Sequence, residues 1–198
     1  ARGVTPVTGA GAETATGTEG STEGIDTAAT AAASALDGDP VRIGVLLDTT
    51  NLMATTDRQP GVAFVTAIER IAANGDLDGR AVEVTWANTT SRMSVVDAEA
   101  AEMIDAGVDL LVVTCELDFA RPAIDRAVAA GVLVVSPCGS EAEWASGALG
   151  PTAFSMVPPA EVLGASMADH AWEEGHRRVG IVVDDTAPEA GAECQGFR

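Results

Sequence analysis

Short apolar, β-branched runs alternate with helix-period segments from Val41 to Asp185. Such runs are typical of buried strands, and the segments between them place apolar residues on one face of a helix. The alternation predicts an α/β fold: a doubly wound, mostly parallel sheet whose strands are joined by crossover helices. Ligands bind beyond the carboxyl ends of the strands in such sheets, so function is expected in the turns there.

The predicted elements follow one another in a regular order. Strands are expected at Val41–Leu47, Arg80–Trp86, Asp109–Thr114, Val132–Ser136 and Ala153–Val157. Helices are expected at Gln59–Ala73, Ser94–Ala106 and Phe119–Ala130, and a further helix and strand at Ala160–Glu174 and Val179–Asp184. We expect the first five strands in the flavodoxin-like order 2-1-3-4-5, because crossovers are right-handed and the switch point lies beside the first strand.

Helical periodicity also predicts which side chains face the sheet. The first helix is expected to bury Val62, Val65, Ile68 and Ala72, and the second Val96, Ala100, Met103 and Ile104. Asp118 precedes the third helix, where it could be the N-cap, a ligand contact, or both.

Composition divides the chain into three parts. Residues 1–40 contain six carboxylates, one Arg and no aromatic residue, which predicts a disordered tether rich in Ala, Thr and Gly. Cloning or gene-prediction debris is the alternative for this segment. Residues 41–157 are expected to form one ligand-binding lobe. Residues 158–198, after the Pro158-Pro159 pair, are expected to begin a second, incomplete α/β lobe.

Charge and cysteine spacing exclude several function classes. A formal net charge of −19 disfavours nucleic acid and anionic membrane surfaces as partners. No apolar run is long enough for a transmembrane helix. Cys115, Cys138 and Cys194 lack CxxC spacing, and His170 and His176 fit no zinc pattern with them, so we expect no metal and no cofactor. No P-loop, GxGxxG or nucleophile–base pair is present, so we do not expect an enzyme.

Six phrases of the chain, in order, carry a family resemblance. They are IGVLL, NGDLDGR, AGVDLLVV, AGVLVVSPCGS, FSMVPPAE and RRVGIVVDD. The set resembles the type I periplasmic binding proteins, in particular the Leu/Ile/Val-binding subunits of ABC transporters. Those proteins have patterns such as AGGINGR, AGVPLISPSAT, FRTAPSD and KKVAILYDD at the corresponding places. The resemblance runs from Val41 to the C-terminus.

The resemblance implies two α/β lobes that close on a ligand. The function it implies is an extracytoplasmic solute-binding protein that delivers a small polar ligand (an amino acid, amide or polyol) to an ABC transporter permease. The implied location is periplasmic or at the cell surface, with lipid anchoring through a removed or absent N-terminal segment as one option. The alternative is a ligand-sensing extracellular domain of a receptor with the same fold. An enzyme on a flavodoxin-like sheet is a second rival.

The resemblance places the ligand at three strand-end turns. The predicted ligand-binding residues are Thr50, Met53, Glu116, Leu117, Asp118, Cys138, Gly139 and Ser140. Ser140 retains a hydroxyl where the family has Thr, and the amides of Gly139 and Ser140 are expected to donate to a ligand oxygen. The family's hydroxyl-bearing turn after the third strand is replaced here by Cys115-Glu116-Leu117-Asp118. Its two carboxylates disfavour an anionic group and suit a cationic or hydroxyl-rich ligand.

The strand order further predicts a disulfide. Cys115 and Cys138 follow the third and fourth strands, which are neighbours about 4.8 Å apart, within the Cα range that a disulfide accepts. An extracytoplasmic location would let the bond persist. Because lobe two is incomplete, we expect these 198 residues alone to bind small ligands weakly or not at all.

Overall fold

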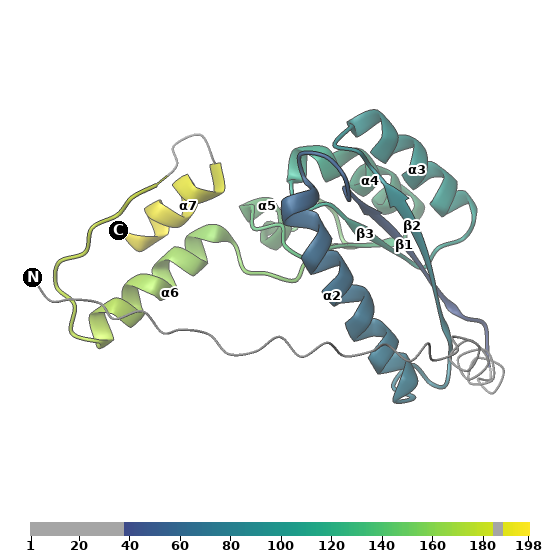
Figure 1. The fold of residues 1–198 in the computed structure, drawn as a ribbon, viewed down its shortest axis with the longest axis horizontal. Helices are drawn as coiled ribbons and strands as arrows, with labels where there is room; N and C mark the ends of the chain where they lie inside the picture. The colour runs from purple at the N-terminus through teal and green to yellow at the C-terminus, as the bar shows by residue number, and fades with distance from the viewer. Residues whose placement is uncertain (1–37, 184–187) are drawn as a thin grey trace, which may run out of the picture. The chain divides into compact units, whose positions relative to one another are not determined.

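A five-stranded parallel sheet is the centre of the protein (Figure 1). The computed structural model describes residues 38–183 and 188–198. The strands are β1 (Val41–Leu47), β2 (Val82–Asn88), β3 (Leu110–Val113), β4 (Leu133–Ser136) and β5 (Ala153–Ser155), in the order β2-β1-β3-β4-β5. All four pairings are parallel. The predicted fold class and strand order are therefore confirmed, whereas most of the predicted tether lies outside the described residues.

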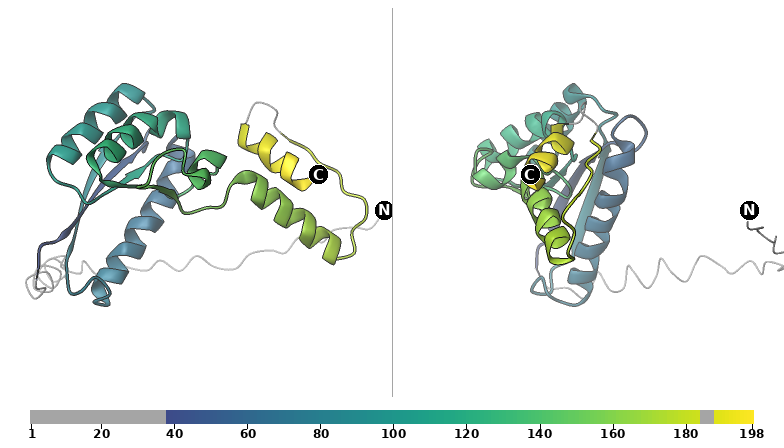
Figure 2. Two further views of the ribbon diagram at one scale, coloured as in Figure 1. Left: turned by 180° about the vertical axis from the view of Figure 1, so that it is seen from behind. Right: turned by 90° about the vertical axis from the view of Figure 1, so that its left-hand side faces the viewer.

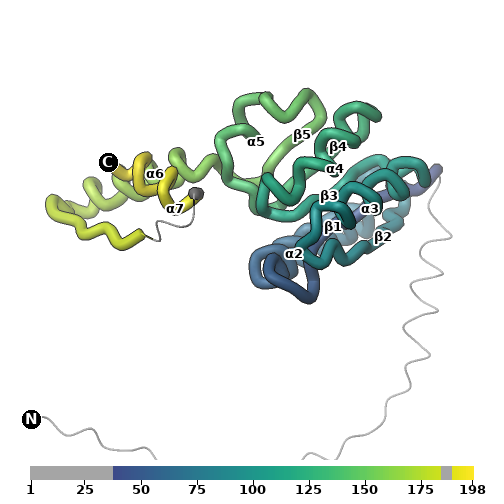
Figure 3. The backbone as a smooth tube through the Cα atoms, turned by 90° about the horizontal axis from the view of Figure 1, so that it is seen from above, coloured from purple at the N-terminus to yellow at the C-terminus, as the bar shows by residue number. Residues whose placement is uncertain are grey.

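Helices cover both faces of the sheet. The crossovers are α2 (Ala54–Ala73), α3 (Met93–Asp105) and α4 (Leu117–Ala130), and the short α5 (Ala142–Ser146) follows β4. Figure 3 shows α2 on one side of the strands and α3 with α4 on the other. This arrangement is the double winding that the alternating sequence pattern predicted.

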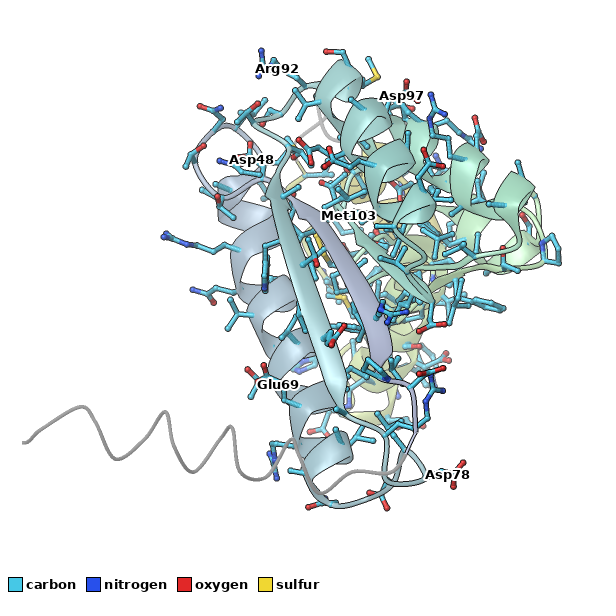
Figure 4. All side chains as sticks on the ribbon, turned by 90° about the vertical axis from the view of Figure 1, so that its right-hand side faces the viewer. Asp48, Glu69, Asp78, Arg92, Asp97 and Met103 are labelled. Atoms are coloured by element: carbon cyan, nitrogen blue, oxygen red, sulfur yellow. A yellow bond between two sulfur atoms is a disulfide. The ribbon has the colours of Figure 1, made fainter. Side chains whose placement is uncertain are left out.

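Alternation of side chains along each strand produces two apolar cores. The core under α3 and α4 includes Leu46, Val96, Ala100, Met103, Leu111, Val113, Ile124 and Val134. The core under α2 consists of Ile43, Val45, Leu47, Val65, Leu110, Val112 and Val135. Figure 4 shows Met103 between α3 and the strands, as the helical period predicted.

The first helix differs from its prediction in both its start and its buried face. It begins at Ala54 rather than Gln59, so Pro60 lies inside it and removes one helical hydrogen bond. The buried positions are Asp57, Gly61, Val65 and Ala72, whereas Val62 is 53% exposed. Val65 and Ala72 face inward as predicted, but Gly61 takes the inner position that was expected for Val62, and the earlier start adds Asp57 to the same face.

The described part of residues 158–198 contains two paired helices rather than the expected helix and strand. In Figures 1 and 2, α6 (Ala160–Glu173) and α7 (Pro188–Phe197) lie side by side. A Cβ on Gly164 of α6 would collide with the backbone carbonyl of Glu193, so the two helices approach closely there.

The predicted strand at Val179–Asp184 is wrong over its described part. Val179–Val183 have no strand structure, and their side chains are exposed. Asp184 lies outside the described residues. A strand requires a neighbour to accept and donate its backbone hydrogen bonds, and none is present for this segment in the described part of the chain.

Candidate functional site

Parallel strands bring all their carboxyl ends to one side of the sheet, here called the carboxyl edge, which consists of the turns that follow β1 to β5. Asp48 lies at this edge and Asp78 lies at the opposite end of the sheet (Figure 4). The chain leaves β1 through α2 on one face toward β2, and leaves β3 through α4 on the other face toward β4, so the switch point lies where β1 meets β3. Ligand crevices of open α/β sheets form at such points.

Asp48 fixes the turn after β1. Its buried carboxylate accepts the amides of Thr50 and Asn51, both at 2.8 Å, and the amide of Met53 at 3.3 Å. It also accepts the hydroxyl of Ser91, from the turn after β2. Burial by itself raises the pKa of Asp48, but the hydrogen bonds from Ser91 and the three amides together hold that pKa below its usual range. The turns after β1 and β2 are thereby joined.

Asp57, from the first turn of α2, joins the ends of β1 and β3. Its side chain is fully buried. One oxygen accepts the amide of Asp48 at 2.9 Å, and the other accepts the Thr114 hydroxyl at 2.9 Å and the Cys115 amide at 3.0 Å. Asp57 is not among the predicted site residues, because the predicted helix began only at Gln59 and so did not include it.

A disulfide joins the ends of β3 and β4. Cys115 and Cys138 are bonded with their Cα atoms 4.9 Å apart, which confirms the predicted pair. Cys194 is a buried free thiol. Gly139 directly follows Cys138 in the turn after β4. Its amide donates to the Ser136 hydroxyl at 2.8 Å. Gly139, whose amide we expected to donate to a ligand oxygen, is buried, and in this structure that amide has a protein acceptor.

Glu141 caps α4 from a distant position in the sequence. One of its oxygens accepts the amide of Leu117 at 2.9 Å, and the other accepts the indole N–H of Trp144 at 3.1 Å. The N-cap position is Glu116, so the predicted N-cap at Asp118 is wrong, and Asp118 is exposed in the first turn. Leu117, one of the predicted ligand-binding residues, is buried in the core.

An open hollow of about 330 Å³ lies over the ends of β3 and β4. Its lining residues are Thr56, Cys115, Glu116, Cys138, Ser140, Glu141 and Glu189. Of the predicted residues, Glu116, Cys138 and Ser140 thus come together, whereas Thr50 and Met53 lie in the turn after β1 and do not line it.

The hollow is acidic. One carboxylate oxygen from each of Glu116, Glu141 and Glu189 lies within 4.8 Å of the others. Burial raises the pKa of Glu116, and the charges of Glu189, Glu141, Asp57 and Asp118 raise it further. No Arg belongs to the lining. Such a spacing would fit a hard cation, although exposed acidic groups also commonly gather without one.

The family follows from a comparison with known proteins. The model of a family described as periplasmic binding protein matches residues 40–193. The chain belongs to this family. The resemblance to type I periplasmic binding proteins is thereby confirmed, and membership implies an extracytoplasmic location. The family is one of solute-binding proteins rather than enzymes.

Solved structures agree on the fold. One is the substrate-binding protein of a branched-chain amino acid transporter from Streptococcus pneumoniae, in complex with isoleucine. Its TM-score is 0.65 at 18% sequence identity, and the match covers 80% of this chain and 45% of the S. pneumoniae chain. An ABC transporter substrate-binding protein from Desulfitobacterium hafniense has a TM-score of 0.63 at 20% identity, over 81% and 46%.

A third similar structure holds an aromatic acid. It is the solute-binding protein of an ABC transporter from Rhodopseudomonas palustris in complex with 3,4-dihydroxybenzoic acid, with a TM-score of 0.61 at 19% identity over 80% of this chain and 44% of its own. The chain therefore spans less than half the length of the structures that it matches. No curated protein matches the chain significantly. Within residues 38–183 and 188–198, no helix has the length and hydrophobicity needed to cross a membrane.

Proposed function

We propose that the protein is an extracytoplasmic solute-binding protein that captures a small polar ligand for an ABC importer. Residues 41–157 would be the first of its two lobes, with the ligand held between the carboxyl edge and a second lobe that closes on it. The observation that carries this proposal is the family match over residues 40–193. A receptor domain of the same fold would bind its ligand in the same way, and would differ in what it is joined to.

The polarity of the carboxyl edge supports a ligand with hydrogen-bond donors. The hollow presents three carboxylates and no Arg. Three amides beside it, those of Cys115, Leu117 and Gly139, already donate to protein oxygens. A ligand carboxylate would meet like charges here, whereas an ammonium, amide or hydroxyl group would meet acceptors. Among amino acids, amides and polyols, we therefore favour an amine or amide group at this side of the site.

Calorimetry with matched ligands tests both the function and the polarity. The panel pairs leucine with leucinamide and adds a polyol and 3,4-dihydroxybenzoate. It is applied to these 198 residues and to a longer protein that includes a second lobe. We expect the longer protein to bind leucinamide at least about tenfold more tightly than leucine, which carries an additional carboxylate, a difference of about 1.4 kcal/mol. The 198 residues alone should bind weakly, because a ligand on one lobe stays hydrated.

Variants separate the hollow from general charge effects. Glu116→Gln removes one lining carboxylate, and Asp125→Asn removes an exposed carboxylate elsewhere on α4. We expect only Glu116→Gln to weaken the cationic ligand. Tight binding of 3,4-dihydroxybenzoate, unaffected by Glu116→Gln, would contradict the proposed polarity, and the absence of any binding by the two-lobe protein would contradict the function.

A further inference from the structure

Asp57 is a buried carboxylate that has no cationic partner among the residues that the structure describes. Its hydrogen bonds come from two amides and one hydroxyl, and neither of the two ion pairs among the described residues includes it. Burying a carboxylate in this way costs free energy, and well-packed apolar replacements of buried charges are often neutral or stabilising. Stability alone therefore does not account for a carboxylate at this position.

The carboxylate of Asp57 fixes the ends of the strands relative to one another. One oxygen is bonded to the end of β1 through the Asp48 amide, and the other is bonded to the end of β3 through Thr114 and Cys115. The disulfide from Cys115 to Cys138 extends this connection to the end of β4. Asp48, in turn, holds the turns after β1 and β2. Four of the five strand ends are thus connected: Asp57 joins β1 to β3 directly, the disulfide adds β4, and the Asp48 side chain adds β2.

Only an ionised carboxylate can accept all three bonds. The donors approach two different oxygens, so both oxygens must act as acceptors. An amide offers one oxygen, and its NH₂ group would face a donor. A protonated carboxyl group would also leave one donor without an acceptor, because its O–H would point toward that donor.

We propose that Asp57 is the positioning residue of the carboxyl edge, and that it sets the relative placement of the ends of β1 and β3. That this edge receives a ligand rests on the proposed function, whereas the positioning of the strand ends does not. A test on the unliganded protein therefore distinguishes a failure of the positioning role from a failure of the proposed function.

The charge state of Asp57 links this role to pH. Burial raises the pKa of Asp57, the bonds from Cys115, Asp48 and Thr114 lower it, and the charge of Asp48 raises it, with a net rise. Glu116, at the start of α4, is the other charged group that faces it. Asp57 should therefore take up a proton at a less acidic pH than an ordinary aspartate. On protonation at least one of its three donors loses its acceptor.

Amide exchange measured by NMR on the 198-residue protein tests the positioning role. In Asp57→Asn, we expect exchange to rise by about tenfold or more at the amide of Asp48, of Cys115 or of both, since the single amide oxygen leaves at least one buried donor without its acceptor. Exchange at Ile124, in the core of α4, should stay within about twofold. The control Asp125→Asn removes an exposed carboxylate and should change neither.

A pH titration supplies a readout that a purely structural role would not move. In the wild-type protein, the amide resonances of Asp48 and Cys115 should shift together with one midpoint above the usual aspartate range. Asp57→Asn should abolish that midpoint. If this variant does not fold, Thr114→Val is the second variant, because it removes one donor to Asp57 and keeps the shape of the side chain. In Thr114→Val, the amide resonances of Asp48 and Cys115 should titrate together less closely than in the wild-type protein. Separate wild-type midpoints, or unchanged exchange at both amides in a folded Asp57→Asn protein, would overturn the inference.

Discussion

Residues 41–157 and residues 158–198 contain similarly apolar segments but bury them to very different extents. In the first region, every strand has a hydrogen-bonded neighbour and both faces of the sheet carry a core. In the second region, α6 and α7 pack on each other, and many large apolar side chains stay exposed. These are Val162, Leu163, Met167, Trp172, Val179, Ile181, Val182 and Val183. The comparison teaches that an apolar, β-branched run becomes a strand only where a neighbouring strand completes its hydrogen bonds.

The largest expected difference between the two regions is in side-chain truncation. Ile124 is fully buried under the sheet, so Ile124→Ala should lower the free energy of unfolding by about 2–5 kcal/mol. The matched change Val182→Ala, at a side chain that is 101% exposed, should alter it by less than about 0.5 kcal/mol. Urea unfolding followed by circular dichroism measures both. Equal effects would show that the two regions share one core.

The disulfide should give the next largest effect, and only in the first region. The bond closes a loop with a sequence separation of 23 residues, for which chain entropy predicts about 3 kcal/mol. A Cys115→Ser, Cys138→Ser double variant should lose roughly that much in urea unfolding. The control Cys194→Ala removes the buried thiol of α7 and should leave the unfolding of the sheet unchanged. If the free energy of unfolding of the sheet changed equally in the two variants, the stabilisation could not be assigned to the Cys115–Cys138 bond.

The smallest expected effect on the sheet comes from separating the helix pair. Gly164→Val would place side-chain atoms against the backbone of Glu193, so α6 and α7 cannot keep their close approach. We expect faster proteolysis within residues 158–198 and a shift of less than about 0.5 kcal/mol in the sheet transition. Ala165→Val, at the exposed neighbouring position, controls for the lower helix propensity of valine. Equal proteolysis of the two variants would mean that the close approach does not hold the pair together.

The local sequence pattern was sufficient to predict the strands of the sheet, but it was insufficient to predict the hydrogen bonds at the carboxyl edge. The strands from Val41–Leu47 to Ala153–Ser155 were predicted because they are apolar, short and bounded by turns. The Cys115–Cys138 pair followed from strand order and spacing. Asp57 and Glu141 were missed because their partners are far away in the sequence: Asp57 bonds to Cys115, and Glu141 caps Leu117. Such contacts depend on tertiary placement, which periodicity does not encode.

At Val179–Val183, by contrast, the local pattern predicted an element that the fold does not form. Their pattern is that of a strand, yet they remain extended and exposed because no partner strand is present in the described part of the chain. Leu117 and Gly139, both predicted to contact the ligand, are also used by the fold itself. Both lie in the expected turns, but the fold uses the side chain of the first in the core and the amide of the second in a turn.

The cap on α4 has an evolutionary consequence. The positive end of a helix attracts anions, and here the carboxylate of Glu141 already occupies the amide of Leu117. The cap residue belongs to a different element from the helix that it covers, so it can change without rebuilding α4. Replacement of Glu141 by a small neutral residue would both remove a negative charge and uncover a hydrogen-bond donor. A single substitution at this position would therefore weaken the repulsion of anions in the hollow, where Glu116 and Glu189 would remain, on an otherwise unaltered scaffold.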